Sequence, residues 1–448
     1  MNFKQQINDY IQSHKKEIVD TLNELIKIPS VRGNAEENAP FGKECARALD
    51  FTKTLYERNG FETELDREGG YLLSYYGEGK KSLGLFAHAD VVPVGDDWTL
   101  TSPFQPIEKD GYIVGRGALD DKSAVVASLF CAKMIKELKL PFCSRLVCFT
   151  GSNEESGMQD IKNYASKHKM PEFSLVCDTA FPLYRGDKGI LHFRATSNTR
   201  LKEISDFSGG AAFNIILGEA HAQIGAQSFT ERGISRHGAL PSGSVNAGYL
   251  LAKKLSEKDD LCECDKEQMK FIASLLEGYY GEVFGIENTD RDFGRLTVTN
   301  GLARTNDGRI SLGFDMRYGA SVDIQNVKEK ICRFFDDNGW SVEWVRESSP
   351  CVIAEDDPYV VACMSAYSGY TGIQDAKPYI NAGGTYARYL SCAAEIGTSI
   401  SSGKRPFDLP QGHGSVHQPD ECISIDGLLN AIELTMLMLL ECDKQGEN

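Results

Sequence analysis

GRGALDDKSAVVASLFCAKMIKELKLPFCSRLVCFTGSNEES, residues 115–156, joins a predicted helix to a predicted strand and carries acidic residues before the helix and after the strand. The apolar segment Lys122–Leu138 is typical of a helix, and Arg145–Thr150 is a short apolar run typical of a buried strand. Further strands are expected at Tyr71–Tyr75, Ser82–Ala87 and Ser174–Cys177. Strands that alternate with helices predict an α/β fold, in which a mostly parallel sheet carries helices on both faces.

The pattern of predicted elements changes after Gly189 and resumes near residue 349. Outside this segment, helices are expected at 4–27, 42–59, 357–371 and 424–441, and a loop at 377–388. Inside it, strands are expected at 190–196, 226–234, 296–299, 309–317 and 341–346, and helices at 209–221, 246–256, 266–279 and 324–338. Two of these stretches look alike, so residues 190–348 are predicted to form an inserted α+β domain with an internal duplication. Residues 1–189 and 349–448 would form the domain that the insert interrupts.

The composition limits the classes of partner. The chain has 448 residues and a formal net charge of −16, which argues against nucleic acid or an anionic membrane as a partner. No apolar run is long enough to span a bilayer, and the polar N-terminal segment lacks the apolar core of a secretory signal. Thirteen cysteines, an odd number without framework spacing, fit reduced thiols and predict a cytoplasmic protein.

Side chains that can bind metal follow the predicted strands or precede the predicted helices. They are His88 and Asp90 in HADVVPVG, Asp120 and Asp121 in GRGALDDKS, Glu154 and Glu155 in TGSNEES, Asp178 in CDTAFP, and His417 in HGSVHQPDE. In an open α/β sheet, ligands bind at the edge formed by the carboxyl ends of the strands. We therefore expect these side chains to meet there. Spacing alone does not separate His417 from His413, which lies four residues earlier.

Several carboxylates at one edge would repel each other strongly without a cation. Two divalent ions that share one carboxylate remove this repulsion and lower the pKa of a water molecule between them. Histidine and carboxylate ligands suit zinc, and also manganese or cobalt. Glu154, next to Glu155, could carry the proton while its neighbour binds metal, although the two could instead cap a helix start. Asp90 could accept the second imidazole N–H of His88 and so orient the ring.

Motifs along nearly the whole chain resemble one known family. They are IPSV, NAPFGKECARALDF, HADVVPVG, GRGALDDKS, GSNEESG, DTAFP, GISRHGALPSGSVNA, GFDMRYG, GGTYAR and HQPDE. Together they resemble the M20 family of dinuclear metallopeptidases and, within it, the PepV-type dipeptidases. The resemblance implies that the domain built from 1–189 and 349–448 is catalytic, that 190–348 is a lid, and that a hydroxide bridging two metal ions attacks a dipeptide.

The resemblance also implies residue roles in the metal centre. His88 and Asp178 would bind the first metal ion, Glu155 and His417 the second, Asp120 would bridge both, and Glu154 would be the general base. The Asp120–Asp121 peptide bond is typically cis in this family. Relatives that remove acyl groups tend to have Glu at the position of Asp178, so Asp178 favours a dipeptidase over a deacylase of N-acyl amino acids. A non-catalytic binding protein would be expected to lack a ligand or the base.

Roles in substrate binding follow from the same resemblance. His237 would steady the oxyanion with Asn214 nearby, Arg317 would bind the free carboxylate of the peptide, and Gly384 and Thr385 would line the pocket. A surface ion pair is the alternative for Arg317. Because a duplicated lid supplies the histidine within one chain in PepV-like enzymes, the resemblance implies a monomer. Asp110, Asp187 and Asp206 lie in turn-like segments and are expected to be solvated.

Overall fold

The computed structural model describes residues 3–400, 405 and 407–445, and the chain forms two compact units. Unit 1 comprises Met1–Gly186, Val352–Tyr379 and Gly384–Asn448, and unit 2 comprises Asp187–Cys351 and Ile380–Gly383. The predicted insert 190–348 thus lies inside unit 2, a few residues within its limits. Residues 380–383 join unit 2 because the carbonyl of Asn381 accepts from the Lys188 N–H and the carbonyl of Ala382 accepts from Arg317. None of the helices in the described ranges is both long and apolar enough to cross a membrane.

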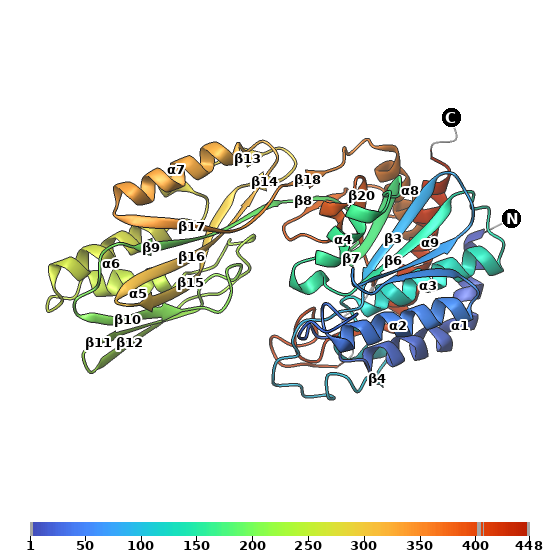
Figure 1. Cartoon of the computed structure of the whole chain (residues 1–448), viewed down its shortest axis with the longest axis horizontal. Helices are drawn as coiled ribbons and strands as arrows, with labels where there is room; N and C mark the ends of the chain where they lie inside the picture. The colour runs from blue at the N-terminus through green and yellow to red at the C-terminus, as the bar shows by residue number, and fades with distance from the viewer. Residues whose placement is uncertain (1–2, 401–404, 406, 446–448) are drawn as a thin grey trace. The chain divides into compact units, whose positions relative to one another are not determined.

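The main sheet of unit 1 has nine strands in the order β1-β2-β6-β3-β7-β20-β8-β18, with β19 paired to β8 (Figure 1). The strands are β1 Glu62–Asp66, β2 Tyr71–Tyr76, β3 Ser82–His88, β6 Arg145–Gly151, β7 Phe173–Thr179, β8 Tyr184–Asp187, β18 Cys351–Val352, β19 Tyr379–Asn381 and β20 Ala393–Gly397. The four central strands β6, β3, β7 and β20 are parallel, while β1, β2 and β8 pair antiparallel. The sheet is therefore mixed, with the predicted parallel strands at its centre.

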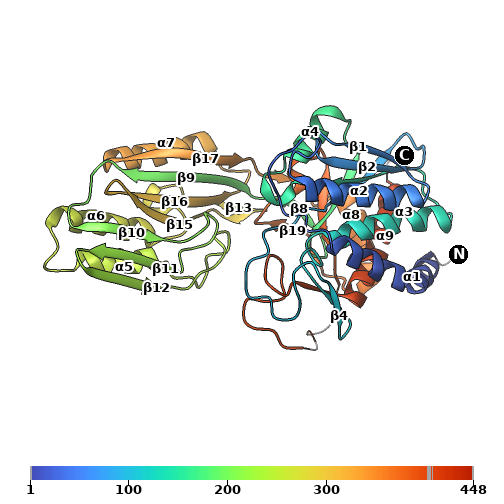
Figure 2. The same ribbon diagram turned by 60° about the horizontal axis from the view of Figure 1, so that its bottom comes forward.

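Helices cover both faces of this sheet. They are α1 Phe3–Ile26, α2 Lys43–Arg58, α3 Lys122–Glu137, α4 Gln159–Lys167, α8 Pro358–Thr371 and α9 Ile425–Asp443, with the short η1 Glu154–Ser156 and η3 Tyr386–Tyr389. Successive residues of one strand point to opposite faces, and Leu85 joins the core beneath α1, α3 and α9 while Phe86 joins the core beneath α4 and η3. Figure 2 brings α1, α2 and α3 of the first layer into view. Because α3 lies between the sheet and other helices, it is buried on nearly every side, as its continuous apolar sequence predicts.

A small sheet of β4 Ile107–Lys109, β5 Tyr112–Val114 and β21 Cys422–Ser424 completes unit 1. Because β21 pairs with β5, it ties the segment that follows His417 to the segment that precedes Asp120.

Unit 2 contains a seven-stranded sheet in the order β12-β11-β10-β15-β16-β9-β17, whose neighbours pair antiparallel (Figure 1). Its strands are β9 Gly189–Ser197, β10 Ile204–Gly209, β11 Glu219–Ile224, β12 Gln227–Arg232, β15 Thr297–Asn306, β16 Arg309–Tyr318 and β17 Trp340–Ser348. The other elements are α5 Ala247–Ser256, α6 Glu263–Leu276, α7 Ile324–Asp337, η2 Glu282–Phe284, β13 Thr289–Asp290 and β14 Gly294–Arg295. One hydrophobic core joins α5, α6 and α7 to a single face of the sheet.

The helix predicted at 209–221 is wrong. This range contains the end of β10, a loop and the start of β11. Gly210 has φ +74°, and a Cβ on Gly209 would lie 2.5 Å from the carbonyl oxygen of Glu219, so the backbone turns back on itself here. Ala220 and Ala222 then point into the core at the two-residue spacing of a strand.

Candidate metal centre

Five segments that are distant in sequence bring metal-capable side chains to one edge of the unit 1 sheet. His88 ends β3, and its strand partner Gly151 ends β6, directly before the loop that carries Glu154 and Glu155. Asp120 precedes α3, Asp178 lies near the end of β7, and His417 lies in the loop before β21. Possible ligand atoms of His88, Asp120 and Glu155 lie within 4.8 Å of one another, and so do those of His88, Glu154 and Asp178.

Asp120 lies between two histidines. Its Oδ1 is 3.1 Å from His88 Nε2, and its Oδ2 is 3.0 Å from His417 Nε2. His88 Nε2 is also 3.8 Å from Asp178 Oδ1, and His417 Nε2 is 3.2 Å from Glu155 Oε1. Each oxygen of the Asp120 carboxylate thus faces a different group of potential ligands, which is the arrangement that a bridging carboxylate needs. The peptide bond between Asp120 and Asp121 is cis.

The residues present fit a divalent cation. His88 Nε2, Asp120 Oδ1 and Glu155 Oε1 are buried without a hydrogen-bond partner, although buried polar groups are nearly always bonded. These three atoms belong to the same group of potential ligands. A histidine nitrogen with carboxylate oxygens is a donor set that zinc and similar ions prefer.

The pKa values of these side chains also favour a cation at this site. Burial and the charge of Asp178 raise the pKa of Glu154 well above its usual range. Burial and the charge of Asp120 raise the pKa of Asp178 to about 6. The neighbouring carboxylates of Asp120 and Glu155 raise the pKa of His417 to about 10. Raised pKa values mean that these side chains hold protons because too little positive charge lies near them. A bound metal ion can supply that positive charge.

Asp90 contacts both the imidazole and the loop that carries the two glutamates. The backbone carbonyl of Asp90 lies 2.9 Å from His88 Nδ1, and its carboxylate Oδ1 lies 3.5 Å from the same nitrogen. The nearer acceptor for the imidazole N–H is therefore the carbonyl and not the carboxylate that the sequence suggested. A proton on Nδ1 leaves Nε2 free for a metal ion. The carboxylate accepts the N–H of Glu154 at 3.1 Å and of Glu155 at 3.2 Å, so it holds the start of η1.

His413 lies outside both groups of potential ligands. Its Nδ1 is 2.8 Å from Asp420 Oδ2, and the same carboxylate accepts the backbone N–H groups of Thr99 and Leu100. His413 therefore helps to hold a loop, while His417 faces Asp120.

Sequence reasoning missed Glu421, which supports the loop that precedes α3. Its Oε1 accepts the N–H groups of Gly117, Leu119 and Asp120 at 2.9–3.1 Å. Its Oε2 accepts from Arg116 Nη1 at 2.5 Å, and Arg116 Nη2 donates to the carbonyl of His417 at 3.3 Å. A single buried ion pair thus holds the backbone of two predicted metal ligands. Glu421 stands in the HQPDE motif, but the pattern carried no signal for this contact.

The structure places Gly384 and Thr385 directly before η3 in unit 1. The Thr385 hydroxyl accepts the N–H of Ala387 at 3.2 Å and caps this helix. A Cβ on Gly384 would collide with the guanidinium of Arg388, so the glycine makes room for that group.

The remaining predicted residues lie in unit 2. Asn214 Nδ2 is 3.4 Å from His237 Nε2, and the N–H of Ala239 donates to His237 Nδ1 at 3.2 Å. Burial and the charge of Arg317 lower the pKa of His237, which favours the neutral ring. Arg317 is 4% exposed, and it pairs with the buried Asp315 instead of a surface carboxylate.

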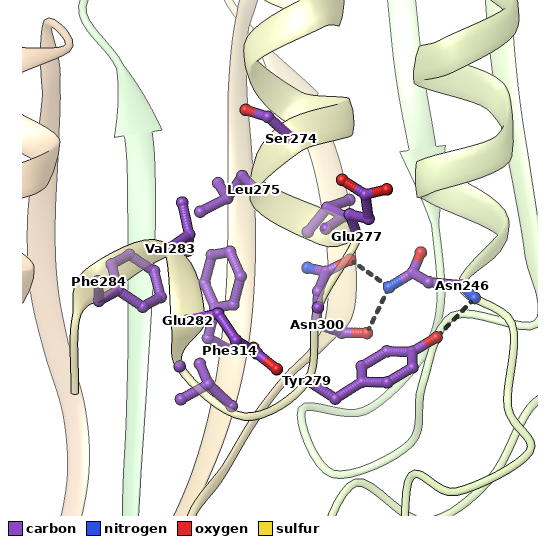
Figure 3. A pocket seen from close by; sticks show the side chains of 14 residues that line it. Asn246, Ser274, Leu275, Glu277, Tyr279, Glu282, Val283, Phe284, Asn300 and Phe314 are labelled. Carbon is purple, nitrogen blue, oxygen red and sulfur yellow. Dashed lines mark hydrogen bonds between the residues drawn. The ribbon is translucent and has the colours of Figure 1, made fainter. Parts of the chain in front are cut away.

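A cavity of about 450 Å³ lies at the end of α6 in unit 2 (Figure 3). It is lined by Asn246, Ser274–Tyr279, Gly281–Phe284, Val298, Asn300 and Phe314, none of which is a predicted site residue. The buried side chain of Asn246 donates to Asn300 and accepts from the N–H of Gly248, and Asn300 donates to the carbonyls of Leu302 and Gly313. These amides are satisfied by the protein itself, so we assign the cavity no ligand.

Comparison with known proteins gives one family. Residues 84–441 match the sequence profile described as Peptidase family M20/M25/M40. A protein of Staphylococcus saprophyticus named "Putative dipeptidase" is 28% identical, over 95% of this chain and 97% of its own length. A similarly named protein of Staphylococcus epidermidis is 27% identical over 95% and 96%.

Solved structures share the fold at low sequence identity. Human carnosine dipeptidase 1 superposes with a TM-score of 0.63 at 16% identity, covering 99% of both chains. A tripeptidase from Staphylococcus aureus superposes with a TM-score of 0.61 at 16% identity, covering 96% of this chain and 99% of its own.

Proposed function

The chain belongs to peptidase family M20/M25/M40, and we propose that it hydrolyses the amide bond of dipeptides with two divalent metal ions. The observation that carries the proposal is the pair of ligand groups that meet at Asp120, with the unbonded atoms His88 Nε2, Asp120 Oδ1 and Glu155 Oε1. The names of the relatives support dipeptides as the substrate class.

His88 and Asp178 would hold the first metal ion, Glu155 and His417 the second, and Asp120 would contact both. When bound, such a pair of ions supplies the charge that polarises the scissile carbonyl and acidifies a water molecule. Zinc is the ion that we favour, with manganese and cobalt as alternatives for these ligands. Asp90 would hold the backbone from which the carboxylates of Glu154 and Glu155 extend, because it accepts both of their N–H groups.

Glu154 would move the proton. Its raised pKa makes it able to accept a proton from the attacking water and to deliver it to the nitrogen of the leaving amine. His237 would donate from Nε2 to the developing oxyanion, with Asn214 beside it. Arg317 would bind the C-terminal carboxylate of the substrate, and Gly384 and Thr385 would shape the pocket.

The experiment that tests the proposal is Glu154→Gln. We expect kcat to fall by roughly 10²–10⁴ because general-base catalysis is lost, while two metal ions per chain remain bound. Glu441→Gln, the same change at a partly exposed glutamate of α9, should leave kcat unchanged. A Glu154→Gln enzyme that hydrolyses dipeptides as fast as the parent would show that the base is wrongly assigned.

A substrate panel separates the dipeptidase from the deacylase. The parent, stripped of metal and reloaded with zinc, manganese or cobalt, would be offered free dipeptides, tripeptides and N-acetyl or N-succinyl amino acids. We expect dipeptides to be cleaved fastest, and a preference for N-acyl amino acids would refute the dipeptidase assignment.

We further propose that the protein is a cytoplasmic monomer. Support for the monomer is the three-stranded extension β10–β12, which enlarges the sheet of unit 2 within one chain. Support for the cytoplasm is that all thirteen cysteines lie in the described part of the chain and none forms a disulfide there. A mass of about twice 49.4 kDa by light scattering would contradict the monomer.

A further inference from the structure

Arg317 is held by a second residue of its own strand. The side chains of Asp315 and Arg317 lie on the same face of β16 because they are two residues apart. Arg317 Nε donates to Asp315 Oδ1 at 2.8 Å and to Oδ2 at 3.0 Å, and the Asp315 side chain is fully buried. A charged donor and acceptor in a buried setting make a strong and directional contact.

Asp315 is fixed from the neighbouring strand as well. His192 lies opposite Asp315 in the register of β9 and β16, with its Nε2 3.0 Å from Asp315 Oδ1. The His192 ring in turn stacks on Phe213, with ring centres 5.0 Å apart and planes 3° from parallel. Burial would raise the pKa of Asp315, but the adjacent His192 imidazole and the charge of Arg317 outweigh it and lower the pKa, so the carboxylate is ionised at neutral pH.

These contacts leave several N–H groups of the guanidinium for a ligand. A guanidinium has five N–H groups, of which Asp315 takes the one on Nε and the carbonyl of Ala382 takes one on Nη1, at 2.8 Å. In the described part of the chain, no protein atom accepts a hydrogen bond from Nη2 of Arg317. Three N–H groups, two on Nη2 and one on Nη1, are therefore left for an incoming carboxylate.

Asp315 also supports the loop that carries His237. A Cβ placed on Gly238 would lie 3.0 Å from Asp315 Oδ2 and would collide with the hydroxyl of Thr299. The backbone next to His237 therefore packs directly on the carboxylate that orients Arg317.

We propose that Asp315 is a positioning residue for substrate recognition, which turns the Nη1–Nη2 edge of Arg317 toward the C-terminal carboxylate of the dipeptide. This inference rests on the proposed function and adds to it the residue that makes carboxylate recognition directional. It predicts that loss of Asp315 weakens binding of substrates with a free carboxylate more than binding of substrates without one.

The test compares a dipeptide with its C-terminal amide in the parent, Asp315→Asn, Arg317→Lys and the double variant. Asparagine keeps an oxygen that can accept from Nε but loses the charge. We expect Asp315→Asn to raise KM for the dipeptide about tenfold, because the hydrogen bond that orients Arg317 loses its charge assistance. KM for the amide should stay unchanged. In the Arg317→Lys background, the same change should have little further effect, since the two residues act as a unit.

The matched control is Asp307→Asn. Asp307 is an exposed aspartate at the turn between β15 and β16, and its replacement should change KM neither for the dipeptide nor for the amide. Should Asp315→Asn fail to fold, His192→Gln removes a support of Asp315 more gently and should raise KM for the dipeptide alone, by about threefold.

Equal changes in KM for the dipeptide and the amide, or additive effects in the double variant, would overturn the positioning role. A parent enzyme that cleaves neither the dipeptide nor the amide would instead overturn the proposed function. The two failures are therefore distinguishable.

Discussion

Replacement of Glu421 by glutamine tests how the structure holds the metal centre. Glu421 and Arg116 are each 1% exposed and form an ion pair that no solvent screens. The glutamate also accepts three backbone N–H groups of the loop that carries Asp120. Glutamine keeps the shape and one oxygen acceptor, but it leaves the charge of Arg116 without a counter-charge.

The size of the effect follows from these contacts. Removal of one partner of a buried ion pair costs about 3–5 kcal/mol, because the other charge stays buried and uncompensated. The one remaining oxygen can still accept from the loop, so we add no further loss for the backbone bonds. Since a folded domain is stable by about 5–15 kcal/mol, Glu421→Gln should remove a large part of the free energy of unfolding. Affinity for the metal ion that we propose His417 and Asp120 to share should fall by about 10–100-fold, as for other changes behind a metal ligand.

Two measurements check this prediction. Urea unfolding of the chelator-treated protein gives the change in the free energy of unfolding, and metal analysis after dialysis gives the number of ions per chain. Glu441→Gln is the control, because Glu441 is partly exposed and only pairs with Lys444, so its change should alter stability by less than about 0.5 kcal/mol. A Glu421→Gln protein within about 1 kcal/mol of the parent that retains two ions per chain would refute the reasoning.

Two further predictions concern charge. Removal of metal by a chelator should abolish activity and lower the melting temperature, because the buried carboxylates of Asp120, Glu155 and Asp178 then face each other without a cation. Each ion, supplied at 100 times its Kd, should restore about 2.7 kcal/mol, seen by thermal unfolding. Asp290 in unit 2 has its pKa lowered to about 2, because hydrogen bonds from Ser321 and from backbone N–H groups outweigh its partial burial. A lowered carboxylate pKa stabilises the fold fully above about pH 4 and loses this effect as pH falls through 2. Asp290→Asn should therefore be less stable than the parent by about 1–2 kcal/mol at pH 7, by about half of that at pH 3 and by little at pH 2, measured by urea unfolding.

Elements with strong periodicity could be predicted from the sequence. The helix that starts at Lys122 and the strand that starts at Arg145 are found where the apolar pattern placed them, as α3 and β6. The pattern failed at 209–221, where two glycines and close backbone contacts, and not hydrophobic spacing, determine the path. Asp187, expected to be solvated, is fully buried within β8, because its segment is a strand and not a turn.

The predicted metal ligands could be found from the sequence, whereas the carboxylates that hold other residues in place could not. His88, Asp120 and Glu155 stand at the ends of predicted elements, so the topology of an α/β sheet already predicts that they meet. Glu421 and Asp315 have no such signal, because an orienting carboxylate is identified only by the partners that the fold gives it. For Glu421 the partner is Arg116, 305 residues away, and for Asp315 the partners are Arg317 on the same strand and His192 on the next. In sequence, Asp315 looks no different from the exposed Asp307; burial and the paired Arg317 separate them. The decisive result is that the effects of Arg317→Lys and Asp315→Asn on KM for the dipeptide are non-additive while Asp307→Asn leaves KM unchanged. That result would mean that a carboxylate positions a substrate-binding residue in this chain when its charge is buried against that residue.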